Sequence, residues 1–169
     1  MKITQYFFAS LLLTFCFTSA AWAFDTEKQL EIEPLADNLY QYRSYKHVDG
    51  YGLVSSNGLI VIHDKEALLI DTPWTDQHTA ELVTWIENKQ LTLTASISTH
   101  FHEDRSGGIN LLNKKGIKTY ATEATNQLLK KKSAALATNL LAPINDSLFY
   151  QQIETYYPGG GHSHDNIAI

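Results

Sequence analysis

The chain has 169 residues, of which 44% are hydrophobic and 18% are charged, and its formal net charge is −5. This composition predicts one soluble globular domain, and the acidic balance argues against nucleic acid as a partner, because phosphate binding requires a basic surface. A polybasic membrane anchor is disfavoured for the same reason. Cys16 is the only cysteine, so a disulfide within the chain is excluded and any metal site must use histidine and carboxylate ligands.

Residues 1–23 have the pattern of a secretory signal peptide. Lys2 precedes an almost unbroken apolar run from Phe7 to Phe17, and Ala21-Trp22-Ala23 fits a cleavage site with small residues. The run is shorter than the roughly 20 residues that span a bilayer, which disfavours the alternative of a membrane anchor. We therefore expect a mature domain that begins at Phe24, in an oxidising compartment such as a bacterial periplasm.

Residues 38–71 carry the pattern of an antiparallel meander. Apolar and β-branched residues are concentrated in four short segments, Leu39 to Tyr45, Tyr51 to Ser55, Leu59 to His63 and Ala67 to Asp71. The breaks at Asp49-Gly50 and Asn57-Gly58 are typical of tight hairpin turns, because these residues accept positive φ. We therefore expect four consecutive antiparallel strands.

Helices and strands alternate after the meander. The spacing of apolar residues predicts helices at about 76–90, 107–112 and 123–132, strands at 91–97 and 117–121, and one or two strands within 147–157. This order indicates a mixed sheet layered with helices. The last residues, 166–169, have the pattern of a strand that nothing closes, so we expect a C-terminally truncated domain at 24–169. A complete terminal strand is the alternative.

The segment His100-Phe101-His102-Glu103-Asp104-Arg105 follows directly after the strand predicted at 91–97. Residues i and i+2 of an extended segment project to the same side, so His100 and His102 can direct two imidazoles at one metal ion. Asp104 follows with the same parity. Imidazole and carboxylate ligands together suit zinc. The alternative is a surface loop with three polar residues.

A glycine-rich segment, Pro158-Gly159-Gly160-Gly161, precedes His162. Alone, such a segment is more often a simple turn. Together with His100 and His102, however, His162 would complete a site of three histidines that leaves the fourth zinc position open, as in catalytic zinc sites. The remaining histidines lack ligand spacing, and we expect them at the surface or in turns: His47, His63, His78 and His164.

Three segments together resemble the metallo-β-lactamases of subclass B1: Leu69-Ile70-Asp71-Thr72-Pro73-Trp74, the His100-x-His102-x-Asp104-Arg105 motif, and the glycine-rich segment with His162. Most other hydrolases of this superfamily carry histidine at the position of Arg105, and B2 enzymes carry asparagine at that of His100. The resemblance covers about residues 35–169, roughly the first two thirds of a B1 chain. It implies an α+β fold, the αβ/βα four-layer sandwich, represented here by its N-terminal half and the start of the second half.

The resemblance also implies a ligand set. His100, His102 and His162 would hold the first zinc, and Asp104 would bind the second, orient the nucleophile and transfer a proton. The second site of B1 enzymes also uses a cysteine and a further histidine, which have no counterpart in residues 24–169. Two zinc ions are therefore expected per full-length chain, with only the first site complete in this sequence.

The implied function is zinc-dependent hydrolysis of the β-lactam amide bond by a metal-bound hydroxide, which confers antibiotic resistance. Two alternatives remain, another zinc hydrolase of the same fold that acts on thioesters or esters, and an inactive metal-binding fragment. We expect a periplasmic monomer with a small β-lactam substrate, no nucleic-acid partner and no stable membrane anchor.

Two further features follow from the resemblance. Asp71 would accept a hydrogen bond from the outer shell of the zinc site, although capping of the turn after it is equally compatible with the sequence. Residues 45–52 match the mobile hairpin that closes over substrate in B1 enzymes, with Val48 and Tyr51 as its apolar contacts. Many relatives carry tryptophan near the position of Tyr51, and an ordinary hairpin is the alternative.

Overall fold

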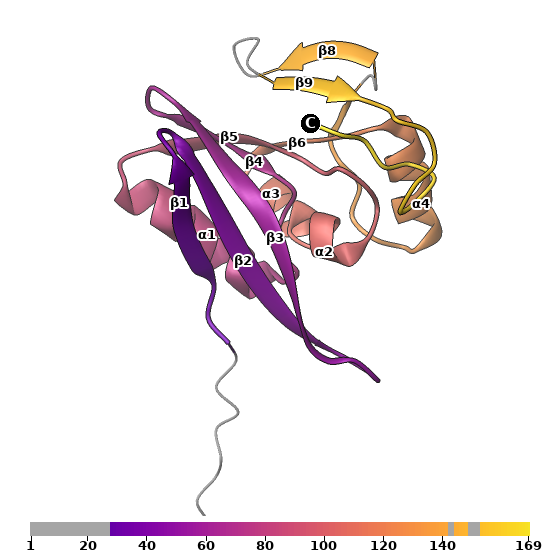
Figure 1. The fold of residues 1–169 in the computed structure, drawn as a ribbon, viewed down its shortest axis with the longest axis horizontal. Coiled ribbons are helices and arrows are strands. Elements are labelled where there is room, and N and C mark those ends of the chain that lie inside the picture. The colour runs from indigo at the N-terminus through magenta and orange to yellow at the C-terminus, as the bar shows by residue number, and fades with distance from the viewer. Residues whose placement is uncertain (1–27, 142–143, 149–152) are drawn as a thin grey trace, which may run out of the picture.

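The structure is a computed structural model that describes residues 28–141, 144–148 and 153–169. The segment interpreted as a signal peptide lies outside these residues. The main element is a seven-stranded sheet with the strand order β1-β2-β3-β4-β5-β6-β7 (Figure 1). Neighbouring strands are antiparallel from β1 to β4 and parallel from β4 to β7. The strands are β1 (Glu31–Ala36), β2 (Leu39–Val48), β3 (Gly52–His63), β4 (Glu66–Ile70), β5 (Thr92–Ile97), β6 (Lys118–Ala121) and β7 (Asn139–Leu140).

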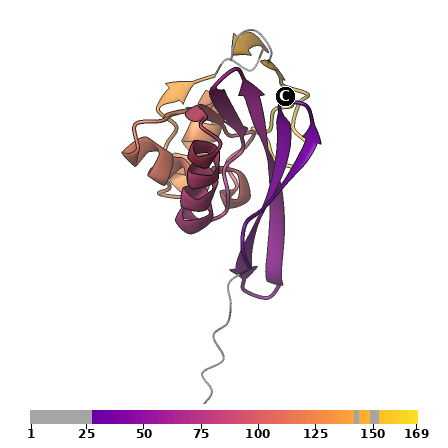
Figure 2. The ribbon, with the colours of Figure 1, turned by 90° about the vertical axis from the view of Figure 1, so that its left-hand side faces the viewer.

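Four helices connect or follow these strands: α1 (Asp76–Asn88), α2 (Glu103–Ser106), α3 (Ile109–Lys114) and α4 (Glu123–Lys131). Figure 2 shows the helices gathered on one side of the long strands. On this side Leu82 and Ile86 of α1 pack against Tyr42 and Leu69 of the sheet, in a cluster of fully buried side chains. The predicted mixed sheet layered with helices is therefore confirmed. Among the described residues, no helix has the length and apolarity required to cross a membrane.

The opposite face of the sheet carries a second apolar cluster. Side chains alternate between the faces along a strand, so Leu68 and Ile70 of β4 lie on this face, whereas Leu69 lies on the helical one. Here the cluster includes Ile153 and Ile167. They belong to the C-terminal part of the chain, where β8 (Ile144–Leu148) and β9 (Ile153–Tyr156) form a separate antiparallel pair. The C-terminal part therefore crosses to the face away from the helices.

The meander differs from the sequence prediction at Asn57-Gly58, which does not form a turn. β3 runs without interruption from Gly52 to His63, and Gly58 lies opposite Tyr42 on β2. A Cβ atom at Gly58 would overlap the ring and hydroxyl of Tyr42. Gly58 therefore makes room for the buried Tyr42 ring rather than supplying a positive φ. The turn at Asp49-Gly50 is confirmed, with Gly50 at φ 78°.

Other parts of the fold were also not expected, including α2 and β7. β1 adds a strand before the predicted meander, although it contains Pro34 and two glutamates. His78, expected at the surface, is only 1% exposed. The backbone N–H of Tyr45 donates to Nδ1 of His78, so Nε2 carries the proton and donates to the carbonyl of Lys28. His78 therefore fastens α1 to β2 and to the segment before β1.

Candidate metal centre

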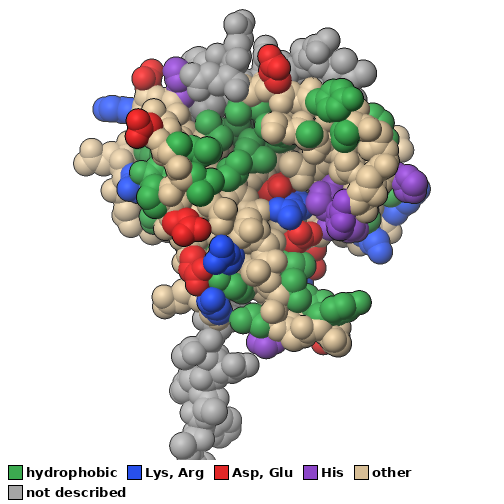
Figure 3. Space-filling view, viewed as in Figure 1, with side chains coloured by type: hydrophobic (Ala, Val, Ile, Leu, Met, Phe, Trp, Pro, Cys, Tyr) green, Lys and Arg blue, Asp and Glu red, His purple; other side chains and the backbone are tan. Residues whose placement is uncertain are grey.

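The three histidines singled out in the sequence come together in space. Their ligand atoms all lie within 4.8 Å of one another, and they form the metal-binding group found among the described residues. Nδ1 of His102 and Nε2 of His162 are 3.0 Å apart although 60 residues separate them in the chain. Figure 3 shows histidine side chains gathered on one face of the molecule, beside acidic and basic side chains.

His100 follows the buried strand β5 and is only 7% exposed. Its Nδ1 lies 3.2 Å from the hydroxyl of Thr99, which itself donates to Oδ1 of Asp71. Because that hydroxyl has a single proton, already given to Asp71, the short contact requires His100 to donate from Nδ1. Its Nε2 is then an unprotonated acceptor. This nitrogen is buried and has no hydrogen-bond partner among the described residues.

Electrostatics also keep His100 neutral. Burial lowers the pKa of its imidazole to about 4, and the neighbouring Asp104 carboxylate opposes this shift. A neutral imidazole is the form that binds a metal ion. Tautomer and protonation state therefore both leave Nε2 of His100 available as a ligand.

Asp71 lies directly after β4 and is buried, with 5% exposure. It adopts φ 65°, a left-handed conformation that aspartate tolerates better than most residues. Both the backbone N–H and the hydroxyl of Thr99 donate to Oδ1 of Asp71 at 2.8 Å. Burial raises the pKa of this carboxyl to about 6, although the bonds from Thr99 and the charge of Arg105 act in the opposite direction. The carboxylate thus contacts the residue that holds His100.

Arg105 connects the two carboxylates of the site. Its Nε lies 3.1 Å from Oδ2 of Asp104, and its Nη1 lies 3.4 Å from Oδ2 of Asp71. The same Nη1 donates to the carbonyl of Asn57 on β3. Asp104 is half-buried and is not one of the three clustered ligands. The guanidinium therefore orients Asp104 beside the histidines without placing it among them.

Close packing holds the loop that carries His100, His102 and Asp104, the metal-binding loop, against the residues after β4. The carbonyl of Arg105 accepts hydrogen bonds from the backbone and hydroxyl of Thr72 and from the hydroxyl of Ser98. A Cβ atom at Gly107 would lie 2.9 Å from the carbonyl oxygen of Pro73 and closer still to that of Trp74. Gly107 is thus required for this close approach, in addition to any role in starting the short helix α3.

The side chain of Asn166, which was not predicted to take part in the site, shapes the loop with His162. Oδ1 of Asn166 accepts from the backbone N–H groups of Gly161 and Ser163, on either side of the histidine. The N–H of Ile167 donates to the carbonyl of Thr99 at 3.0 Å. This bond places the loop beside the His100 segment. An asparagine four residues after a histidine in a glycine-rich segment was the available signal for this role.

The predicted hairpin spans the end of β2 and the start of β3, with Val48 paired with Gly52. Val48 is half-buried, whereas Tyr51 at the tip is 82% exposed. An ion pair of 2.5 Å joins Lys46, in the stem of this hairpin, to Glu103 of the metal-binding loop. The hairpin is therefore tied to the segment that lies between His102 and Asp104, a contact that the sequence did not reveal.

Known proteins are similar to this chain in both sequence and fold. No protein-family model matches it. It is 39% identical over 155 residues to a metallo-β-lactamase type 2 of Pseudomonas aeruginosa, and 35% identical over 164 residues to one of Bacteroides fragilis. The crystal structure of DIM-1 metallo-β-lactamase exposed to ceftazidime matches with a TM-score of 0.82 and 46% identity, over 85% of this chain and 65% of that one. The chain belongs to the B1 metallo-β-lactamases.

These alignments cover 92% and 94% of this chain, but only 62% and 66% of the two curated metallo-β-lactamases. The chain therefore spans slightly less than two thirds of their length.

The histidines of this metallo-β-lactamase chain fit zinc on their own geometry. Imidazole nitrogens about 2.0–2.1 Å from a tetrahedral zinc lie about 3.3 Å apart, close to the 3.0 Å between His102 and His162. The buried Nε2 of His100 has no hydrogen-bond partner among the described residues, as expected of an atom that a metal would engage. Zinc is accordingly the cofactor of this centre.

Proposed function

We propose that the whole protein hydrolyses the amide bond of β-lactams at the zinc centre of His100, His102 and His162. The observation that carries this proposal is the free, buried Nε2 of His100 beside the facing nitrogens of the other two histidines. Three histidines leave one position of a tetrahedral zinc open, which distinguishes catalytic from structural zinc sites. The names of the related proteins support the same activity.

The residues of the chain have distinct roles in this proposal. Zinc at the three histidines would supply a Lewis acid and lower the pKa of its water to about 7. Thr99 and Asp71 hold the proton of His100 on Nδ1 and so keep Nε2 directed to the metal. Arg105 holds Oδ2 of Asp104, which leaves Oδ1 to orient the attacking water and accept its proton. Asp104 would also be one ligand of a second zinc in the whole protein.

The hairpin would act as a flap over the substrate. Val48 and Tyr51 would contact apolar parts of the β-lactam, and the high exposure of Tyr51 supports this role because the ring is free to meet a ligand. The ion pair between Lys46 and Glu103 supports it further, since it holds the stem of the flap at the metal-binding loop.

We also propose that the protein is exported to the periplasm and acts there as a monomer. Support comes from the sequence of residues 1–23, with its basic start, apolar run and small residues before the cleavage position. Cleavage after Ala23 would remove Cys16, the single cysteine of residues 1–169, and the loss of a spare thiol suits an oxidising compartment.

The decisive experiment uses the zinc-loaded full-length protein and compares hydrolysis of a carbapenem with that of a glutathione thioester. We expect carbapenem turnover that is lost on chelation and in His102→Ala. His63→Ala is the matched control, because His63 lies at the end of β3 outside the histidine cluster. Unchanged carbapenem turnover in His102→Ala would contradict the proposal. Preference for the thioester would instead assign the chain to another reaction of the same fold.

A further inference from the structure

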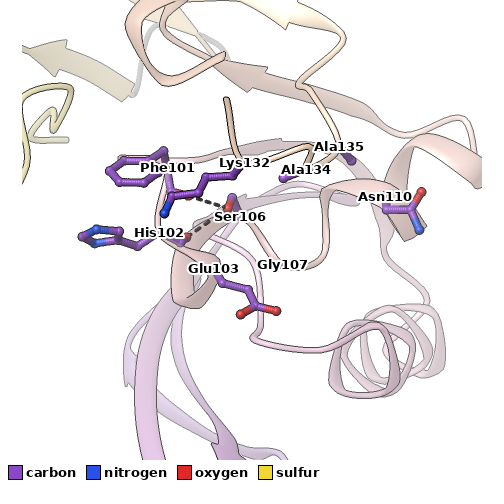
Figure 4. A pocket seen from close by; sticks show the side chains of 9 residues that line it. All are labelled: Phe101, His102, Glu103, Ser106, Gly107, Asn110, Lys132, Ala134 and Ala135. Atoms are coloured by element: carbon purple, nitrogen blue, oxygen red, sulfur yellow. Dashed lines mark hydrogen bonds between the residues drawn. The ribbon is translucent and has the colours of Figure 1, made fainter. Parts of the chain in front are cut away.

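A pocket of about 490 Å³ lies between α2, the start of α3 and the residues that follow α4 (Figure 4). His102 lines it, but His100, His162 and Asp104 do not. The pocket therefore adjoins the metal centre without being part of it. Its volume is within the range of pockets that hold small ligands in proteins, about 300–1,000 Å³.

One part of the pocket is apolar and suits a flat ring. The half-buried Phe101 side chain provides an aromatic surface, and the methyl groups of Ala134 and Ala135 and the backbone of Gly107 complete this part of the lining. The hydroxyl of Ser106 donates to the carbonyls of Phe101 and His102, as Figure 4 shows. These bonds hold the pocket wall in place, so the aromatic surface is formed in advance of any ligand.

The polar part of the pocket carries an uncompensated positive charge. Lys132, the C-cap residue directly after α4, extends toward Phe101 and His102 (Figure 4). Among the described residues, Lys132 has no ion-pair partner. Glu103 also lines the pocket, but its carboxylate is directed away from Lys132 and is paired with Lys46. Asn110 adds an amide that can donate hydrogen bonds.

From this combination we propose that the pocket binds a small aromatic carboxylate, with its ring against Phe101 and its carboxylate on Lys132. Lys132 is exposed, so water solvates its ammonium group when no ligand is bound, and a carboxylate in the pocket would add an ion pair to it. A cationic ligand would meet a like charge, and a purely apolar ligand would gain nothing from Lys132. The inference goes beyond the proposed hydrolysis and does not depend on it. It also separates Lys132 from the adjacent Lys130 and Lys131, which do not line the pocket.

The test is a titration of the zinc-loaded protein with benzoate, followed by amide chemical shifts in NMR spectra. We expect saturable shifts in residues 101–107 and 131–135. Lys132→Met should weaken binding about threefold to fivefold, the effect of losing one partly exposed charge pair. The matched control Lys131→Met should leave the affinity unchanged, and Ala135→Trp should abolish binding by filling the pocket. Benzamide, which has the same shape without the charge, should bind wild type and Lys132→Met equally.

Two outcomes would overturn the inference. Shifts centred on residues 159–166 that persist in Ala135→Trp would place benzoate at the metal centre instead. The absence of saturable shifts up to about 50 mM benzoate would show that the pocket does not recognise this class of ligand. Zinc content and shift dispersion of each variant establish that it is folded and loaded. Neither measurement involves β-lactam hydrolysis, so a failure of the benzoate-binding proposal can be told apart from a failure of the proposed hydrolysis.

Discussion

The hydroxyl of Thr99 donates to the buried carboxylate of Asp71 at 2.8 Å while its oxygen lies 3.2 Å from Nδ1 of His100. The chain Asp71–Thr99–His100 fixes the imidazole tautomer and leaves Nε2 directed to the metal position. Partners of this kind orient metal ligands and are worth about tenfold to 100-fold in metal affinity.

Thr99→Val tests this relationship. The substitution keeps the shape of the side chain but removes its hydroxyl, so we expect zinc affinity to fall about tenfold or more, as for other outer partners of ligating histidines. A competition titration with a chromophoric chelator measures the change. Thr94→Val is the matched control, because Thr94 lies in β5 and its hydroxyl donates to the carbonyl of Ala67 on the neighbouring strand β4, away from the histidines. Equal zinc affinity in Thr99→Val and wild type would contradict the role of Thr99.

The pKa of His100 predicts how the stability of the zinc-free protein changes with pH. The folded pKa, about 4, lies below the ordinary value of 6.5, so between these values the unfolded chain binds more protons. The free energy of unfolding should therefore rise with pH in this window. Asp71 acts in the opposite direction, since its folded pKa of about 6 exceeds the ordinary 3.8.

Asp71→Asn removes that opposing contribution. We expect the free energy of unfolding to rise more steeply between about pH 4 and 6 in Asp71→Asn than in wild type, measured by urea denaturation of the zinc-free proteins. Asp64→Asn is a suitable control because Asp64 is an exposed turn residue. Parallel pH profiles for wild type and Asp71→Asn would mean that Asp71 has no raised pKa.

Arg105→Met should change the pKa of Asp71, a residue that the substitution leaves in place. The positive charge of Arg105 lowers the pKa of Asp71, so its removal should raise that pKa above about 6. Carbon-13 NMR titration of the aspartate side chains measures this directly. Arg43→Met, which removes a surface arginine paired with Glu31, should leave Asp71 unaffected. A pKa that stays constant would show that the guanidinium does not act on Asp71.

Gly58→Ala tests the packing that replaced the expected turn. The added methyl group would overlap the Tyr42 ring, and overpacking of this kind costs about 1–3 kcal/mol. Thermal or chemical denaturation gives the value. In a Tyr42→Leu background the same substitution should cost less, because the two changes share one space. Additive costs would argue that the Tyr42 ring is not what requires glycine.

Tyr51→Ala tests the proposed flap in the full-length protein. The loss of an exposed aromatic contact should raise KM for a β-lactam severalfold and leave zinc affinity unchanged. Leu35→Ala is the control, since Leu35 is also an exposed apolar side chain but lies in β1. If KM remains at the wild-type value, the hairpin does not contact substrate.

Much of the fold could be predicted from local patterns. The boundaries of α1, β5, β6 and α4 lie within about two residues of the predicted ones, because each combines clear periodicity with polar or glycine breaks. β1 was missed because its proline and glutamates obscure a strand pattern, and it is stabilised by pairing with β2. The turn predicted at Asn57-Gly58 was wrong for the converse reason. A pair that often forms turns is also compatible with a strand, where Gly58 accommodates the large ring of Tyr42.

By itself, the sequence determined the types and order of the chemical groups. His100, His102 and Asp104 could be singled out because ligand spacing on an extended segment is a local property, and His162 because a glycine-rich segment precedes it. Only the tertiary structure decided which nitrogen of His100 faces the metal, that Arg105 joins Asp71 to Asp104, and that His78 is buried. Each of these features depends on at least one contact between residues 28 or more positions apart. Such contacts arise when the sheet, the loops and the helices pack together, and no periodicity in the chain encodes them.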